Sequence, residues 1–152
     1  MPRIRVAVTI SAPRDQVWSA IEDIEGHSRW MTDAAAIMFT SQRRSGRGTS
    51  FDCLTRVGPF ALIDSMEVTR WEPGRRLGVI HAGVVQGTGE FRLRPRGLRR
   101  RRTRLVWSER LRFPWWLGGR IGAWIATPVL WTIWRSNLAR LRDLVESGAL
   151  DR

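Results

Sequence analysis

Apolar and polar residues alternate at the start of the chain. Ile4, Val6, Val8 and Ile10 fall on one face of an extended segment, while arginine, alanine and threonine fall on the other. A period of two with one apolar face predicts a strand over residues 3–10. This strand should lie with its apolar face on a core.

Two short helices are predicted after this strand. Apolar residues recur at helical spacing from Val17 to Ile24, and Gly26 ends that segment. Residues 27–30 then predict a second short helix or turn.

Short runs with strand character, separated by turn signals, fill the region from Ala34 to Leu111. Clusters such as Ser45-Gly46-Arg47-Gly48 and Glu72-Pro73-Gly74 mark the turns. Consecutive hairpins of this kind predict an antiparallel sheet in meander order. The strands are expected over residues 35–41, 49–56, 60–71, 75–82, 85–94 and 102–111.

Residues 113–148 predict one long helix that starts after Pro114. From there to Trp134 only Arg120 is charged, so a membrane span is conceivable on length alone. However, Leu138 and Val145 continue an apolar stripe at sevenfold spacing, and a sustained stripe needs a soluble body to pack on. We therefore expect a packed helix. The stripe runs through Trp124, Trp131, Leu138 and Val145.

The order of elements predicts an α+β fold in one domain, residues 1–152. A curved antiparallel sheet of about seven strands should wrap around the long C-terminal helix, with two short helices after the first strand. A curved sheet around one helix leaves a space between them, which is either filled by side chains or kept as a pocket.

The net charge of +12, carried by arginine without any lysine, suggests two further classes of binding partner. Nucleic acid and anionic membranes both attract basic proteins. The alternative is a bias toward arginine spread over exposed faces, with Arg96 and Arg99–Arg102 at a solvated hairpin tip. We favour this alternative and do not expect nucleic-acid binding.

The remaining composition narrows the chemistry. The single cysteine, Cys53, excludes an internal disulfide and a cysteine-based zinc cluster. His27 and His81 have no second ligand at metal-binding spacing, and residues 83–89 lack the strand–helix context of a phosphate loop. We therefore predict neither a metal nor a cofactor. No apolar run follows the start, which predicts no signal peptide and a cytoplasmic protein.

Four segments carry a family resemblance. They are Ile10-Ser11-Ala12-Pro13 with Val17-Trp18, then Asp23-Ile24 followed by Trp30, then residues 68–77, and last residues 87–95 followed by 103–107. In this order they resemble the START-like (SRPBCC) superfamily, and within it the polyketide cyclase/dehydrase branch. The resemblance implies the helix-grip fold. It leaves the function open, because the superfamily includes lipid carriers, binders of hormones and aromatic ligands, aromatase/cyclases and chaperone activators.

The arginines indicate which face of each strand points inward. In residues 104–112 they occupy even positions, so Trp107 and Glu109 should face the concave side. A carboxylate among apolar neighbours is costly unless it is paired or protonated, which makes Glu109 a candidate functional group. The same argument on the other strands predicts a pocket wall of Trp30, Phe51, Cys53, His81, Phe91, Trp107 and Glu109.

The long helix is expected to close this pocket. An apolar, aromatic-rich cavity suits a lipid or a polycyclic aromatic molecule. The alternative is a solid core made of the same side chains. The helix residues predicted at the cavity are Ile121, Trp124, Ile125, Pro128 and Trp131.

We predict that the protein binds or carries a hydrophobic small molecule, either a lipid or a polyketide-like aromatic, and favour this over an enzyme. One alternative is a cyclase/dehydrase-type enzyme, in which His81 and Glu109 act as an acid–base pair in aldol cyclisation or dehydration.

A second alternative is a protein that associates with an anionic membrane surface. Trp115 and Trp116 could dip into the bilayer beside Arg112 and Arg120. Nothing in the pattern specifies an oligomeric state.

Overall fold

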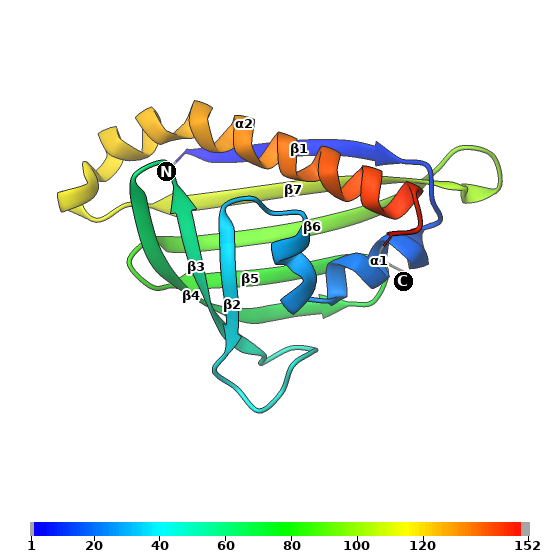
Figure 1. Cartoon of the computed structure of the whole chain (residues 1–152), viewed down its shortest axis with the longest axis horizontal. Helices are drawn as coiled ribbons and strands as arrows, with labels where there is room; N and C mark the ends of the chain where they lie inside the picture. Colours follow the sequence, from blue (N-terminus) through cyan, green and yellow to red (C-terminus); the bar gives the residue numbers. More distant parts are fainter. Residues whose placement is uncertain (1, 150–152) are drawn as a thin grey trace.

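One long helix lies along a seven-stranded antiparallel sheet in the computed structural model, which describes residues 2–149 (Figure 1). The sheet order is β1-β7-β6-β5-β4-β3-β2, so six strands form a meander and the first strand returns to pair with the last. This confirms the predicted fold class. The strands are β1 Arg3–Ile10, β2 Ala34–Phe39, β3 Ser50–Val57, β4 Phe60–Glu72, β5 Arg76–Ala82, β6 Gln86–Arg96 and β7 Arg102–Arg112.

Short helices follow the first strand, lie in one hairpin of the sheet and precede the long helix. The α-helix α1 Arg14–Glu22 and the 3-10 helix η1 Glu25–Arg29 follow β1, and the 3-10 helix η2 Leu98–Arg100 lies in the β6–β7 hairpin. The 3-10 helix η3 Trp115–Leu117 and the long helix α2 Gly119–Glu146 come last. In Figure 1, α1 lies near the C-terminal half of α2, at the end of the molecule away from η3.

The start of the long helix differs from the prediction. The sequence predicts continuous helix after Pro114, but Gly118 separates η3 from α2, and the φ angles of Gly118 and of Gly119, the first residue of α2, are 89° and 54°. Glycine adopts this left-handed region without the steric cost that other residues meet. The two glycines therefore turn the chain where α2 begins.

The inward faces of the strands agree with the arginine argument. In β7, Leu105, Trp107, Glu109 and Leu111 are buried, and the residues between them are more exposed. On β5 the same alternation buries Leu77 and His81.

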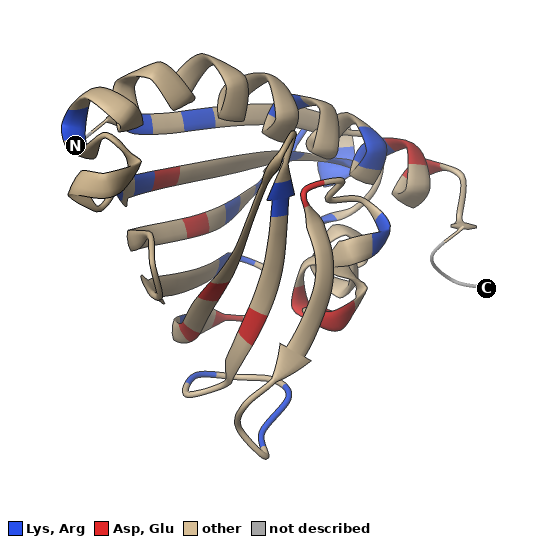
Figure 2. Ribbon diagram, turned by 60° about the vertical axis from the view of Figure 1, so that its left-hand side comes forward, with Lys and Arg blue, Asp and Glu red and all other residues tan. Residues whose placement is uncertain are grey.

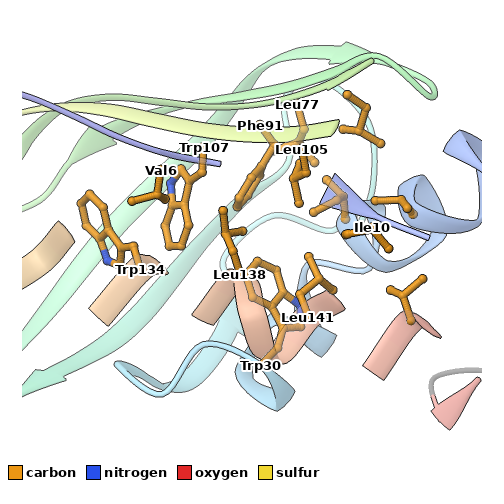
Figure 3. Close-up of a cluster of buried hydrophobic side chains, with 14 of the residues drawn as sticks. Val6, Ile10, Trp30, Leu77, Phe91, Leu105, Trp107, Trp134, Leu138 and Leu141 are labelled. Carbon is orange, nitrogen blue, oxygen red and sulfur yellow. The ribbon is translucent and has the colours of Figure 1, made fainter. Parts of the chain in front are cut away.

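The main core lies between the sheet and the C-terminal half of α2. Figure 3 shows Phe91 and Trp107 of the sheet beside Trp134, Leu138 and Leu141 of the helix. The rings of Trp107 and Trp134 stack with their centroids 4.9 Å apart. Stacked aromatic pairs of this kind stabilise a core beyond the area that they bury.

A buried polar network fastens the same half of α2 to the segment before β2. The Asn137 side-chain amide donates to Asp33 Oδ1 at 2.7 Å, and the Trp134 indole donates to Asp33 Oδ2 at 3.1 Å. The backbone N–H and the hydroxyl of Thr32 both donate to Asn137 Oδ1. Because each member has a partner, the network fixes the position of the helix rather than destabilising the core.

The predicted apolar stripe is wrong over half of its length. Leu138 and Val145 are buried, but Trp124 and Trp131 are exposed. An α-helix has 3.6 residues per turn, so a sevenfold repeat drifts around the axis by roughly 20° each time. Over two repeats this drift carries Trp124 off the face that contacts the sheet, and Ala123 is buried in its place.

None of the helices within residues 2–149 has both the length and the apolar character to cross a membrane. The expected cytoplasmic location stays a prediction. The arginines are spread over the sheet, α2 and the loops rather than gathered on one element (Figure 2). Arg96 and Arg99–Arg102 are exposed at the β6–β7 hairpin, as the interpretation of a solvated tip requires.

Candidate ligand-binding cavity

A cavity of about 470 Å3 lies between the concave face of the sheet and the N-terminal half of α2. Strands β3 to β7 supply most of its wall, and nearly all of the lining side chains are apolar. The helix contributes Gly122, Ile125, Ala126, Val129, Leu130 and Trp134.

The structure brings most of the predicted sheet residues to this cavity. Trp30 is the exception: it is buried in the closed core, with its ring centroid 5.9 Å from Phe91 and 6.2 Å from Trp107. It lies at the end of η1, whose turn directs His27 and Met31 toward the cavity instead. The predicted residues that do line the cavity are Phe51, Cys53, His81, Phe91, Trp107 and Glu109.

On the helix, only Ile125 of the predicted residues lines the cavity. Ile121, Trp124, Pro128 and Trp131 lie outside the cavity lining and are exposed. The cause is the drift of the sevenfold stripe described above, so that smaller residues such as Gly122 and Ala126 lie over the cavity instead. The sequence prediction therefore had the correct segment of the helix but the wrong face.

The mouth of the cavity lies between the β3–β4 hairpin and α2. Phe60 and Ile63 from the hairpin line the cavity and are also exposed to solvent. Ile125 and Val129 do the same from the helix, with Ile125 exposed by 69%. Apolar residues therefore rim the opening on both sides.

Three titratable side chains meet at one place on the sheet wall. His81 of β5 lies between Asp64 of β4 and Glu109 of β7. Its Nδ1 is 2.8 Å from Asp64 Oδ2, at hydrogen-bond distance. Its Nε2 is 3.4 Å from Glu109 Oε2, which is close enough for an ion pair although the two atoms are not aligned as a hydrogen bond. The Trp107 indole donates to the other oxygen, Glu109 Oε1, at 3.0 Å.

Gly89 makes this meeting possible. It lies on β6, directly between Val79 of β5 and Glu109 of β7 in the strand register. Neighbouring strands are about 4.8 Å apart, so the Glu109 side chain has to extend across β6 to reach His81. A Cβ atom at position 89 would lie 2.8 Å from Glu109 Oε1, too close for two non-bonded atoms.

The charge of His81 follows from these neighbours. Burial lowers its pKa, but the negative charge of Glu109 and the hydrogen bonds and charges of both carboxylates outweigh burial and raise the pKa to about 10. The imidazole is therefore protonated at neutral pH. The cluster carries one positive and two negative charges.

Asp64 is the member of this cluster that sequence reasoning missed. Alternation along β4 places it on the same face as Leu62, Met66 and the buried Val68. A carboxylate on an apolar strand face is the same signal that singled out Glu109. Applied to β4, it would have identified Asp64.

The other two titratable side chains of interest are held neutral. Burial lowers the pKa of His27 to about 4, and its Nε2 donates to the Ile21 carbonyl oxygen at 2.7 Å. Burial also raises the pKa of the Cys53 thiol to about 11, which disfavours the reactive thiolate. Within residues 2–149, no three His, Cys, Asp or Glu side chains are arranged to hold a metal ion.

Comparison with known proteins agrees with this architecture. The family model described as "Polyketide cyclase / dehydrase and lipid transport" matches residues 1–146. None of the curated proteins matches the chain by sequence.

Three solved structures with the same fold illustrate how far the sequences have diverged. A conserved protein from Geobacillus kaustophilus has 13% identity and a TM-score of 0.78, with 97% of each chain covered. A protein from Thermus thermophilus has 18% identity and a TM-score of 0.76, covering 97% of this chain and 99% of that one. The ZhuI aromatase/cyclase from a Streptomyces species has 19% identity and a TM-score of 0.69, covering 99% and 94%.

Proposed function

The chain belongs to the polyketide cyclase / dehydrase and lipid transport family, and we propose that it binds and carries a hydrophobic small molecule between its sheet and α2. The observation that carries the proposal is the cavity of about 470 Å3, lined by apolar side chains and open at an apolar mouth. Ligand pockets commonly have volumes of about 300–1,000 Å3. The space therefore suits one lipid chain or one polycyclic aromatic molecule.

The aromatic part of the wall supports this proposal. Phe91, Trp107 and Trp134 line the cavity while they pack against one another in the core. Rigid rings that are held from behind offer a flat apolar surface at little entropic cost to the protein. An apolar guest buried against them leaves water without further ordering of the wall.

Ligand capture provides the direct test. Native mass spectrometry of protein purified from its own host should detect a co-purifying small molecule. Thermal denaturation with a panel of lipids and aromatic polyketides should then show stabilisation, about 2.7 kcal/mol at a ligand concentration of 100 Kd. A panel that shifts the melting temperature nowhere counts against the proposal.

A matched pair of substitutions on β5 separates the cavity from the rest of the fold. Val79 lines the cavity, whereas its neighbour Ile80 is exposed on the outer face. Val79→Phe should fill part of the cavity and weaken binding, while Ile80→Phe adds the same ring outside and should leave binding unchanged. Circular dichroism checks that both variants fold.

A cyclase/dehydrase-type activity is the second candidate, favoured by the meeting of His81 and Glu109 in one cavity. Because His81 is already protonated, Glu109 or Asp64 would have to abstract the substrate proton. The imidazolium would then stabilise the other of these two carboxylates, which stays charged. We expect Glu109→Gln to lower the rate of cyclisation of a linear poly-ketone at least tenfold, whereas Glu72→Gln, at the end of β4, should not. Absence of turnover in the unmodified protein would exclude this activity for that substrate.

Association with an anionic membrane is a third candidate, and it rests on exposed apolar residues near the cavity mouth. Trp115 is 86% exposed and Trp124 is 65% exposed, and Arg112 and Arg120 are exposed nearby in the sequence. Tryptophan favours the interface between membrane and water, and arginine favours anionic head groups. A ligand could then pass between a bilayer and the cavity without crossing water.

Liposome flotation tests this third candidate. Vesicles with phosphatidylserine should bind the protein, and vesicles of phosphatidylcholine alone should bind it less. Trp115→Ser should reduce the bound fraction, while Leu98→Ser should not, because Leu98 is 92% exposed at the distant β6–β7 hairpin. Flotation that is independent of both anionic lipid and salt argues against the candidate.

A further inference from the structure

The polar groups that line the cavity are of a different chemical type from those on the protein surface, and their charge has the opposite sign. We propose that the cavity selects apolar molecules that carry a hydrogen-bond donor, a hydroxyl or an ammonium group, and discriminates against carboxylates. This inference rests on the proposed function, because it concerns the head group of the molecule that the cavity binds. Three observations on the wall support it: most of the ring donors are occupied, acceptors are left over, and carboxylates outnumber cationic side chains.

The ring N–H donors near the cavity already face acceptors. Both nitrogens of His81 face carboxylate oxygens, at 2.8 Å from Asp64 and 3.4 Å from Glu109. The Trp107 indole donates to Glu109 and the Trp134 indole donates to Asp33. Three of these four ring donors make hydrogen bonds, whereas His81 Nε2 lies in an ion pair with Glu109 without hydrogen-bond alignment. A ligand carboxylate would therefore lose its water and gain a hydrogen bond only at Nε2, in competition with Glu109.

The acceptors at the same place are not all used. Asp64 Oδ1 is buried and has no hydrogen-bond partner within residues 2–149. Glu109 lines the cavity with a side chain that is only 9% exposed, and its Oε2 approaches His81 Nε2 without hydrogen-bond alignment. A buried acceptor without a donor is unfavourable. A hydroxyl or ammonium group at this position would supply the donor.

The charge of the wall points the same way. Asp33, Asp64 and Glu109 line the cavity, and His81 is the cationic side chain among them. Glu90 also borders the cavity, but its carboxylate pairs with Arg92 on the outer face of β6. The chain has 26 arginines, yet none of the lining residues within residues 2–149 is arginine. A carboxylate would therefore meet like charge at short range in a medium of low dielectric constant. The basic surface would by itself favour anions, so selection against them has to come from the cavity.

Four probes with one apolar chain and different head groups test the proposal on the full-length protein. They are 1-dodecanol, dodecylamine, sodium dodecanoate and 1-methoxydodecane, and binding is followed by quenching of tryptophan fluorescence. We expect dodecanol and dodecylamine to bind at least tenfold more tightly than the methyl ether, which accepts hydrogen bonds but cannot donate. Dodecanoate should bind more weakly than the ether. Dodecanol against dodecylamine then distinguishes a neutral donor from a cationic one.

Paired variants locate the effect. Asp64→Asn removes the negative charge that faces the cavity, and it should reduce the advantage of dodecanol over the ether at least threefold. Asp52 is one residue from Cys53 on β3 and bonds Ser65 at 2.7 Å on the other face of the sheet, so Asp52→Asn should leave that advantage unchanged. Binding of the ether should be similar in all three proteins, which shows that the cavity is intact.

The outcomes separate the two proposals. If all four probes bind with similar affinity, or dodecanoate binds most tightly, the head-group inference is wrong while the hydrophobic cavity stands. If none of the probes binds, both the inference and the proposed function fail. If Asp52→Asn has the same effect as Asp64→Asn, the preference arises from overall charge and the assignment to this wall is wrong.

Discussion

The two halves of α2 have opposite relations to the sheet. The C-terminal half buries Trp134, Leu138 and Leu141 in the core and is fastened through Asn137. The N-terminal half spans the cavity and leaves large apolar side chains such as Trp124 in solvent. We refer to these two regions as the closed end and the open end.

The comparison shows that apolar content and burial are separate properties of a helix. Between Pro114 and Trp134 only one residue is charged, yet this is the half with the most exposed apolar surface. Soluble proteins rarely leave a contiguous apolar patch exposed unless it binds something. Under the proposed function, the open end contributes to binding more than to stability, and substitutions at the two ends test that division.

The largest difference is expected from truncating one aliphatic side chain at each end. Leu141 is fully buried at the closed end, so Leu141→Ala should lower the free energy of unfolding by about 2–5 kcal/mol. Val129→Ala at the open end should cost less than about 1 kcal/mol, because Val129 is half exposed. Urea denaturation measures both values. Equal losses would show that the two halves of α2 stabilise the fold alike.

The two histidines predict how the stability of the protein depends on pH. The pKa of His81 is raised from 6.5 to about 10, so its contribution to stability is complete below pH 6.5 and is lost as the pH rises through 10. The pKa of His27 is lowered to about 4, so the unfolded chain takes up a proton first and stability falls as the pH drops from 6.5 to 4.

Each histidine can be tested at its own end of the pH range. Urea midpoints of the unmodified protein should fall on both sides of neutrality. His81→Gln should flatten the loss between pH 7 and 10, and His27→Gln should flatten the loss between pH 6.5 and 4. A variant that flattens the opposite limb would contradict the assignment.

A smaller loss of stability is expected when a single polar side chain is replaced by alanine. Asn137→Ala leaves Asp33 Oδ1 and the two Thr32 donors without their partner at the closed end, which should cost roughly 1–3 kcal/mol. Thr127→Ala removes a hydroxyl that bonds only the Ala123 carbonyl oxygen at the open end, and should cost about 0.5 kcal/mol or less. Thermal unfolding at neutral pH resolves the two. If Thr127→Ala costs as much, the open end is anchored more firmly than its contacts indicate.

The smallest change in stability should come from the exposed tryptophan of the open end. Trp124→Ser removes a side chain that is mostly in solvent, so the free energy of unfolding should stay within about 0.5 kcal/mol. Trp134→Ser, in the same helix, serves as the destabilised counterpart. A large loss in Trp124→Ser would mean that its ring packs on the protein in solution.

Much of the architecture could be predicted from the sequence. Short-range signals determine it: turn residues such as Glu72-Pro73-Gly74 bound the strands, and arginine on alternate positions marks the outer face of β7. These signals placed the sheet residues Trp107 and Glu109 on the concave face, where the structure has them.

The incorrect predictions concern geometry that depends on residues far apart rather than on short-range signals. Which face of α2 meets the cavity depends on a helical drift that accumulates over several turns, so Trp124 and Trp131 were placed inside. The contact between Asp64 and Glu109 through His81 depends on three strands and on the space above Gly89. The residue pattern within one strand does not encode an arrangement of three strands. Alternation along β4 does, however, place Asp64 on the concave face.

Cys53 gives the cavity a built-in chemical reporter. It is the only thiol of the chain, it lies on the cavity wall, and burial raises its pKa to about 11. Alkylation proceeds through the thiolate, so the bare protein should react slowly and any guest that covers the sulfur should slow it further. The rate of thiol labelling thus measures occupancy without a dye or a tag on either molecule.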